Sequence, residues 1–176
     1  MVFGRSDATA LAVRLSSPIV TDHLVDIGCG PGSAARTVAR QVALVTGVDP
    51  ATVMLRFARA IPSPRNARWI HADVESLPLT EGEANVIWAI ATVHHWKDLD
   101  LAVREIRRVL APGGRFVATE REIAPDAIGH ASHGWLPEHG EQFAGMCRTA
   151  GFLDVTHSRE VSGDSQFIAV VAHAPS

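Results

Sequence analysis

The stretch Val25-Asp26-Ile27-Gly28-Cys29-Gly30-Pro31-Gly32 is an apolar run that ends in three alternating glycines. The residues before the glycines indicate a buried strand over 24–27, and those after them indicate a helix over 33–40. Glycines at a strand-to-helix turn leave the backbone bare, so a ligand can approach where side chains would otherwise stand. The stretch therefore predicts a ligand-binding turn.

The residues around this turn narrow the class of ligand. A phosphate-binding loop needs a lysine and a hydroxyl residue at its close, and here Ser33 follows Gly32 with no lysine nearby. The dinucleotide fingerprint wants its third small residue where this chain has Ser33, although Asp49, about 20 residues on, suits a ribose in either case. Asp26 would repel a pyrophosphate and attract a cationic group. A zwitterionic nucleoside with a positive sulfur therefore fits better than NAD, which stays the alternative.

Further motifs follow the turn in a consistent order. They are Gly47-Val48-Asp49-Pro50, Ala72-Asp73-Val74-Glu75-Ser76-Leu77-Pro78-Leu79, Val93-His94-His95-Trp96-Lys97-Asp98 and Arg108-Val109-Leu110-Ala111-Pro112-Gly113-Gly114-Arg115. With these motifs the chain resembles the class I S-adenosylmethionine-dependent methyltransferases, within the small-molecule group that includes the ubiquinone and menaquinone C-methylases. The resemblance implies S-adenosyl-L-methionine as methyl donor, S-adenosyl-L-homocysteine as product and a small-molecule acceptor.

The composition of the chain is typical of a globular domain. The chain has 176 residues, 47% of them apolar, and a formal net charge of −3, as expected for one globular domain with a well-filled core. No apolar run is long enough to cross a membrane, and charged residues near the N-terminus interrupt any signal-peptide core. The two cysteines, Cys29 and Cys147, are expected to be free thiols in a reducing compartment. We therefore expect a cytoplasmic protein without a membrane span.

The predicted fold is α/β, with a Rossmann-like, seven-stranded and mostly parallel sheet and helices on both faces. Gly163-Asp164 predicts a tight hairpin, which makes the last strand antiparallel. Residues 1–22 are expected to form a short helical segment, or lid, before the methyltransferase domain at 23–176. Strands are expected at 24–27, 43–48, 67–72, 84–90, 115–119, 152–158 and 166–172, and helices at about 7–15, 33–40, from 49–50 onward, 98–110 and 137–150.

The resemblance also implies which residues bind the donor. Asp49 would accept hydrogen bonds from the ribose hydroxyls, and it also has the sequence of an N-cap for the next helix. Asp73 would accept from the adenine amino group, while the Val74 N–H serves a ring nitrogen. The full expected set is Asp26, Gly28, Cys29, Gly30, Asp49, Pro50, Met54, Asp73, Val74 and Ala91.

The end of the strand at 84–90 is expected to carry the acceptor chemistry, because open α/β sheets bind ligands beyond the carboxyl ends of their strands. A histidine that titrates near neutrality can remove a proton from the acceptor, so His94 or His95 is a candidate general base, with His94 preferred. The alternative is that both histidines only shape the pocket. The spacing His130-x-x-His133, with His139 beyond, lacks a cysteine or carboxylate partner, and no metal is expected.

Two other function classes remain to be weighed. Net acidity and scattered arginines disfavour a nucleic-acid partner, as does the absence of a base-gripping Asn/Asp-Pro-Pro-Tyr/Phe motif. The absence of tyrosine removes the acid/base pair of the short-chain dehydrogenases, which leaves an NAD-dependent oxidoreductase as the weaker enzyme alternative. The short segment between 120 and 136 leaves open a homodimer, a protein partner that completes the pocket, or a non-catalytic donor-binding homologue.

Overall fold

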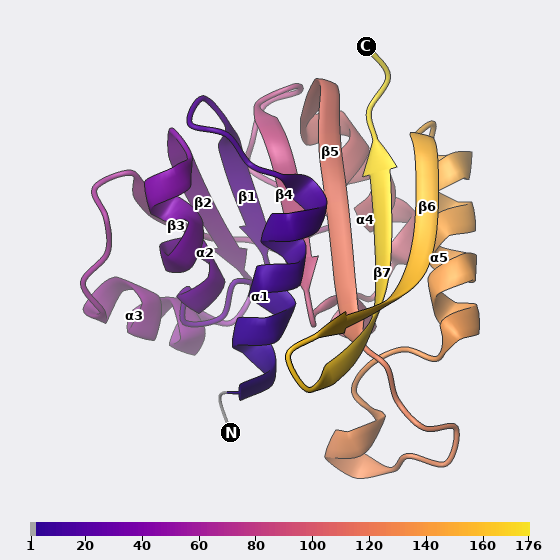
Figure 1. Cartoon of the computed structure of the whole chain (residues 1–176). Coiled ribbons are helices and arrows are strands. Elements are labelled where there is room, and N and C mark those ends of the chain that lie inside the picture. Colours follow the sequence, from indigo (N-terminus) through magenta and orange to yellow (C-terminus); the bar gives the residue numbers. More distant parts are fainter. Residues whose placement is uncertain (1–2) are drawn as a thin grey trace.

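The computed structural model describes residues 3–176 and, within them, every side chain except those of residues 3–5, 130 and 131. Seven strands form one sheet in the order β3-β2-β1-β4-β5-β7-β6, which confirms the predicted fold class (Figure 1). The strands are β1 His23–Ile27, β2 Leu44–Asp49, β3 Ala67–His71, β4 Ala84–Ile90, β5 Leu110–Arg121, β6 Leu153–Ser162 and β7 Ser165–His173. The α-helices are α1 Phe3–Ser16, α2 Ser33–Val38, α3 Thr52–Ala60, α4 Leu99–Val109 and α5 Pro137–Thr149.

The strand directions follow from the connections. Strands β1 to β5 pair in parallel, whereas β7 is antiparallel to both β5 and β6. Ser162 pairs with Ser165 across a two-residue turn whose first residue, Gly163, has a φ of 57°. Such a turn can join only antiparallel strands, so the predicted hairpin and the antiparallel last strand are confirmed.

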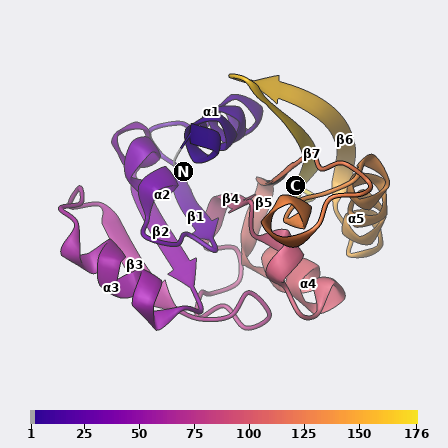
Figure 2. The same cartoon turned by 90° about the horizontal axis from the view of Figure 1, so that it is seen from below.

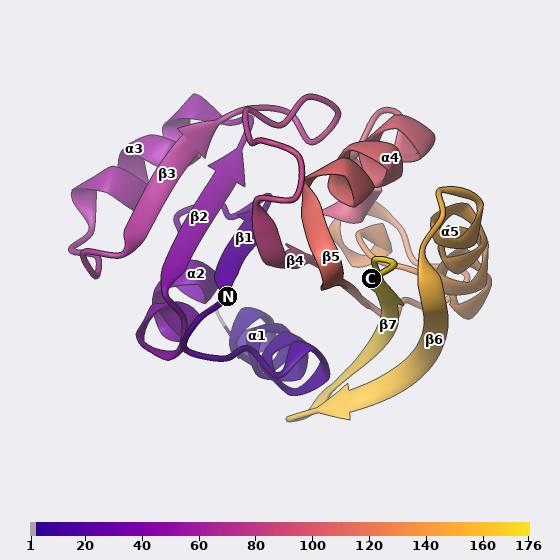
Figure 3. The ribbon, with the colours of Figure 1, turned by 90° about the horizontal axis from the view of Figure 1, so that it is seen from above.

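Helices cover both faces of the sheet (Figures 2 and 3). One hydrophobic cluster contains the buried residues of α1 and α2, and the other contains those of α4 and α5. Strand β4 serves both clusters, because Val86 and Trp88 face the first and Ile87 and Ala89 face the second. This alternation is the two-residue period of a central strand that is buried on both sides. None of the helices in residues 3–176 combines the length and apolar character that crossing a membrane requires.

The start of α3 differs from the prediction. The sequence favours Asp49 as the N-cap and Pro50 as the first helical residue, but the helix begins at Thr52 after Ala51. Asp49 is instead the last residue of β2, where it pairs with His71 of β3. Its carboxylate accepts from the N–H groups of Gly30 and Ala51, which lie outside the helix. The prediction that Asp49 is the N-cap is therefore wrong.

Three other helix and strand boundaries differ from the prediction. Helix α2 is only six residues long and continues as a 3-10 turn, Ala39–Gln41. Strand β5 begins five residues earlier than predicted, because Leu110 already pairs with Ala84 of β4. Helix α1 begins at Phe3 rather than near Asp7. The predicted cap of α4 is confirmed, since the side chain of Asp98 accepts from the Leu101 N–H at 2.9 Å.

The C-terminal end of α1 is anchored to the sheet by Arg115 of β5. The guanidinium donates to the Ser16 carbonyl, to the Ser17 carbonyl at 3.0 Å and to the Asp22 carboxylate at 2.7 Å. The Trp88 indole N–H donates to Ser16 Oγ at 2.9 Å. One arginine thus connects a helix end, a loop and a central strand.

We predict that Arg115→Met lowers the free energy of unfolding by about 2–3 kcal/mol, because it leaves the buried Asp22 carboxylate without its cation. Arg14→Met is the matched control, since Arg14 pairs with Glu160 at 2.9 Å but keeps 56% of its side chain exposed. That variant is expected to cost less than about 1 kcal/mol. Urea unfolding of both variants checks the difference, and equal losses would contradict the anchoring role.

Candidate active site

The turns after β1, β2 and β4 meet at the carboxyl edge of the sheet (Figure 2). In the turn after β1, Gly28, Gly30 and Gly32 have φ values of 67°, 55° and 81°, which other residues rarely adopt. The N–H groups of Gly28 and Cys29 both donate to the Val48 carbonyl, at 2.8 and 3.0 Å. The glycine turn is therefore held against β2 by its own backbone.

The glycines also make room for two side chains. A Cβ on Gly28 would lie 2.0 Å from Oγ1 of Thr92, in the turn after β4. A Cβ on Gly32 would lie 2.2 Å from the ring of Trp69 on β3, and Arg36 lies over that ring at 5.1 Å. Tight packing by protein atoms is thus one reason for glycine at these positions.

Asp49 connects the glycine turn to the turn before α3. One carboxylate oxygen accepts from the Gly30 N–H at 2.7 Å, and the other accepts from the Ala51 N–H at 2.8 Å. Asp49 is buried, and its bond to Gly30 lies in the interior, whereas its bond to Ala51 is partly buried. Each oxygen keeps one lone pair for a further donor such as a ribose hydroxyl.

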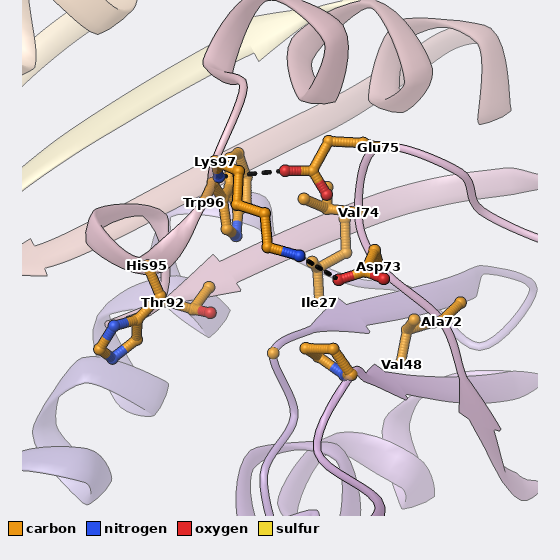
Figure 4. Close-up of a pocket in the computed structure, with 12 residues that line it drawn as sticks. Ile27, Val48, Ala72, Asp73, Val74, Glu75, Thr92, His95, Trp96 and Lys97 are labelled. Atoms are coloured by element: carbon orange, nitrogen blue, oxygen red, sulfur yellow. Dashed lines mark hydrogen bonds and ion pairs between the residues drawn. The ribbon is translucent and has the colours of Figure 1, made fainter.

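A cavity of about 170 Å³ opens beside these turns (Figure 4). Asp73 lies on its wall, half exposed, with a carboxylate oxygen 3.6 Å from the amine of Lys97. Glu75 accepts from the backbone N–H groups of Lys97 and Asp98, at 3.1 and 3.3 Å, and so holds the segment after β3 to the segment after β4. The lining residues are Ile27, Gly28, Val48, Pro50, Ala72, Asp73, Val74, Glu75, Thr92, His95, Trp96 and Lys97.

A second, smaller cavity lies on the other side of the glycine turn. Its lining includes Asp26 and Cys29 together with Thr9 of α1. Burial raises the pKa of the Cys29 thiol, and the negative charges of Asp26 and Asp49 raise it further. Cys29 therefore stays a neutral thiol, unsuited to act as a nucleophile or a metal ligand.

The structure brings most of the predicted donor-binding residues together. The larger cavity contains Gly28, Pro50, Asp73 and Val74, and the smaller one contains Asp26, Gly28 and Cys29. Four predicted residues, Gly30, Asp49, Met54 and Ala91, are in neither lining, although Gly30 and Asp49 bond each other in the glycine turn. Met54 is on α3 with 38% of its surface exposed, and Ala91 follows β4 with a φ of 51°. The role of each residue toward the donor stays a prediction.

His94 is held by a buried carboxylate. Nδ1 of His94 lies 2.8 Å from Oε2 of Glu120, a residue of β5 whose side chain is fully buried. The other oxygen of Glu120 accepts from the Val93 N–H at 2.7 Å and, more weakly, from the His94 N–H at 3.4 Å. Since a carboxylate accepts, Nδ1 carries the proton, and Nε2 is left with its lone pair.

Glu120 is a site residue that sequence reasoning missed. The sequence predicts that the fifth strand ends at Thr119 and places Glu120 in the segment after it, but the strand continues through Arg121. The signal was present: a carboxylate directly after an apolar strand end has to find a partner when the strand runs on into the interior.

Two further histidine rings lie beside His94. The ring centroid of His95 is 4.0 Å from that of His94, and the ring of His133 is 5.3 Å away. Burial lowers the pKa of His95, and the neighbouring imidazoles of His94 and His133 lower it further. Of the histidines in the spacing His130-x-x-His133, with His139 beyond, His130 lies outside the described side chains. Nδ1 of His139 accepts from the Leu136 N–H at 3.2 Å.

An apolar pocket of about 200 Å³ lies beneath the same turn. Trp96 lies on the wall of this pocket and also on the wall of the 170 Å³ cavity beside the glycine turn. Trp135 and Phe143 pack against each other with ring centroids 5.1 Å apart. The lining residues are Val93, His94, Trp96, Leu99, Trp135, His139, Gln142, Phe143 and Met146.

A family model described as a methyltransferase domain matches residues 25–118. The chain belongs to this methyltransferase domain family. The resemblance to class I S-adenosylmethionine-dependent methyltransferases is thereby confirmed. The match covers the turns after β1, β2, β3 and β4 and ends before Glu120.

Individual relatives agree with this assignment. The methyltransferase domain is 33% identical over 108 residues to the ubiquinone/menaquinone biosynthesis C-methyltransferase UbiE of Rubrivivax gelatinosus, covering 61% of this chain and 43% of the relative. It is 30% identical over 131 residues to the malonyl-[acyl-carrier protein] O-methyltransferase of Enterobacter lignolyticus, covering 74% of this chain and 50% of the relative. The chain spans about half the length of the curated relatives it matches.

Solved structures show the same fold. A chain of the complex between the Haloferax volcanii Trm112 methyltransferase activator and a methyltransferase superposes with a TM-score of 0.83 at 19% identity, covering 100% of this chain and 92% of that chain. Haemonchus contortus phosphoethanolamine N-methyltransferase 2, in complex with phosphomonomethylethanolamine and S-adenosylhomocysteine, gives a TM-score of 0.78 at 18% identity and covers 97% of this chain and 53% of that chain.

We predict that Gly28→Ala destabilises the methyltransferase domain by about 2 kcal/mol or more, because it adds a Cβ at a positive φ and against Thr92. Gly145→Ala is the control: Gly145 lies inside α5 with open space at its Cβ position, so alanine there is expected to stabilise by about 0.5–1 kcal/mol. Thermal or urea unfolding measures both changes. Equal stability of the two variants would contradict the packing of Thr92 on the turn.

Proposed function

We propose that this methyltransferase domain transfers a methyl group from S-adenosylmethionine to a small-molecule acceptor. The observation that carries the proposal is one continuous arrangement at the carboxyl edge of the sheet. A glycine turn borders a cavity that is also lined by His95, and the His95 ring lies 4.0 Å from that of His94, which pairs with Glu120. Donor and acceptor groups would thus be held on neighbouring strand ends.

The donor fits the chemistry of the cavity walls. The Asp73 carboxylate on the wall is an acceptor for an adenine amino group. Asp49 lies between the lining residues Val48 and Pro50, and its remaining lone pairs are acceptors for ribose hydroxyls. The buried Asp26 carboxylate in the smaller cavity is suited to an ammonium group. When bound, the donor supplies a methyl carbon activated by its sulfonium.

The acceptor would be aligned from the turn after β4. Glu120 keeps Nδ1 of His94 protonated, so Nε2 can take a proton from an acceptor that carries one. The apolar pocket lined by Trp96, Trp135 and Phe143 adjoins His94 and suits an apolar part of the acceptor. His95 would contribute to the pocket wall rather than to proton transfer.

We predict that isothermal titration of the chain with S-adenosylhomocysteine gives micromolar binding and that Asp73→Ala weakens it about tenfold, or about 1.4 kcal/mol. Because Asp73 is half exposed and pairs only with an exposed lysine in the described chain, this variant is expected to fold normally. Asp100→Ala, at an exposed acid in the first turn of α4, is the matched control and should bind as the wild type does.

The same titration separates the proposal from its alternative. Binding of NAD with no binding of S-adenosylhomocysteine would overturn the methyltransferase function. If Asp73→Ala binds S-adenosylhomocysteine as tightly as the wild type does, the ligand binds at this site without a contribution from Asp73.

A second prediction concerns proton removal. With an acceptor found by screening hydroxyl, carboxyl and amine compounds, His94→Ala is expected to lower turnover by about 100-fold or more. Glu120→Gln should give a smaller loss, since an amide still contacts Nδ1 but stabilises a protonated ring less. Formation of S-adenosylhomocysteine is the readout, and full activity of His94→Ala would mean that no base at this position is used.

A partner-dependent form of this function is a second candidate. The observation that favours it is the likeness to the methyltransferase in the Trm112 complex. The segment between β5 and α5 is short, so a protein partner or a second copy of the chain would complete the acceptor pocket. Two buried free thiols, Cys29 and Cys147, fit the cytoplasmic location proposed here.

A further inference from the structure

Three histidine rings gather beside the end of β4. His94 and His95 belong to the short 3-10 turn after the strand, and His133 comes from the segment between β5 and α5. The centroids of His95 and His133 are 5.6 Å apart with their planes perpendicular. One ring nitrogen of each residue can be chosen so that all three nitrogens lie within 4.8 Å of one another.

This ligand set has a defined preference among cations. Imidazole nitrogen suits zinc and its neighbours in the transition series, whereas magnesium and calcium require oxygen ligands. Tetrahedral coordination at about 2.1 Å places the ligand nitrogens about 3.4 Å apart. The rings of His95 and His133 are exposed, so side-chain rotation can close the remaining distance without moving the backbone.

The ring of His94 is already fixed in the way that is common for metal-ligating histidines. A ligating histidine commonly donates its second ring N–H to a carboxylate, which fixes the ring and raises the basicity of the ligating nitrogen. Nδ1 of His94 has this bond to Glu120, at 2.8 Å and in the protein interior. Nε2 is therefore the nitrogen that His94 presents.

We propose that His94, His95 and His133 form a binding site for a divalent cation of the zinc class, with Glu120 as the carboxylate that orients His94. Three imidazoles leave the fourth coordination position open to water or to an oxygen of a small molecule. A cation at this site uses the Nε2 lone pair, so cation binding and proton acceptance at His94 exclude each other. Only this last consequence rests on the proposed function.

The test is a zinc titration of the full chain after chelator treatment, followed by competition with a chromogenic chelator. One zinc ion per chain is expected. His133→Ala and His95→Ala should each weaken binding by at least about tenfold, and Glu120→Gln by about 10- to 100-fold. Cobalt in place of zinc should give the visible absorption of a tetrahedral site in the wild type and lose it in His133→Ala.

A matched control is available because the chain has nine histidines. His157→Ala removes an exposed imidazole of β6, outside the cluster and outside both pockets of the site, and should leave zinc affinity unchanged. Equal zinc affinity in the wild type and in the His95→Ala/His133→Ala double variant would overturn the proposal, as would a loss of equal size in His157→Ala. Titration of the same samples with S-adenosylhomocysteine tests the donor site separately, so failure of the metal site and failure of the proposed function are distinguishable.

Discussion

Two buried carboxylates hold the turns on which the site depends. Asp49, at the end of β2, accepts from the Gly30 and Ala51 N–H groups and so fixes the turn after β1. Glu120, near the end of β5, accepts from the Val93 N–H and the His94 ring and so fixes the turn after β4. Each carboxylate holds the turn after a neighbouring strand, and Asp49 also holds the turn after its own strand. Because an unpaired buried carboxylate is costly, each of these loops is kept in one geometry.

The space between the two fixed turns is the proposed reaction site. Thr92 packs on Gly28 and sets the distance between the turns, since no side chain fits at position 28. Glu75 and the Asp73–Lys97 pair hold the outer wall of the cavity (Figure 4). The Asp73–Lys97 pair is exposed and therefore weak, so a ligand that donates to Asp73 can displace Lys97 at little cost. The inner wall is rigid and the outer wall adjustable, an arrangement suited to a ligand that enters and leaves.

The sequence predicts the fold well because its strongest signals are local. The glycine turn, the apolar run of β4, the Asp98 cap and the Gly163-Asp164 hairpin each act within a few residues, and all are confirmed. What depends on contacts between distant segments was not predicted. Asp49 resembles a helix cap in sequence, and only the pairing of β2 with β3 shows that it belongs to a strand. Glu120 and His133 gain their partners only when β5 lies beside β4 and the following segment returns over it. A local pattern can mark Glu120 as a carboxylate that needs a partner, but it does not identify that partner.

The central claim is that the donor binds between the turns held by Asp49 and Glu120. Hydrogen exchange measured by mass spectrometry, with and without S-adenosylhomocysteine, tests it most directly. Binding should slow exchange at residues 26–33, 49–54, 72–76 and 92–97, while the β6–β7 hairpin at 153–173 exchanges as before. Slowed exchange confined to the hairpin, or no change at the glycine turn under conditions where the ligand is bound, would contradict the account.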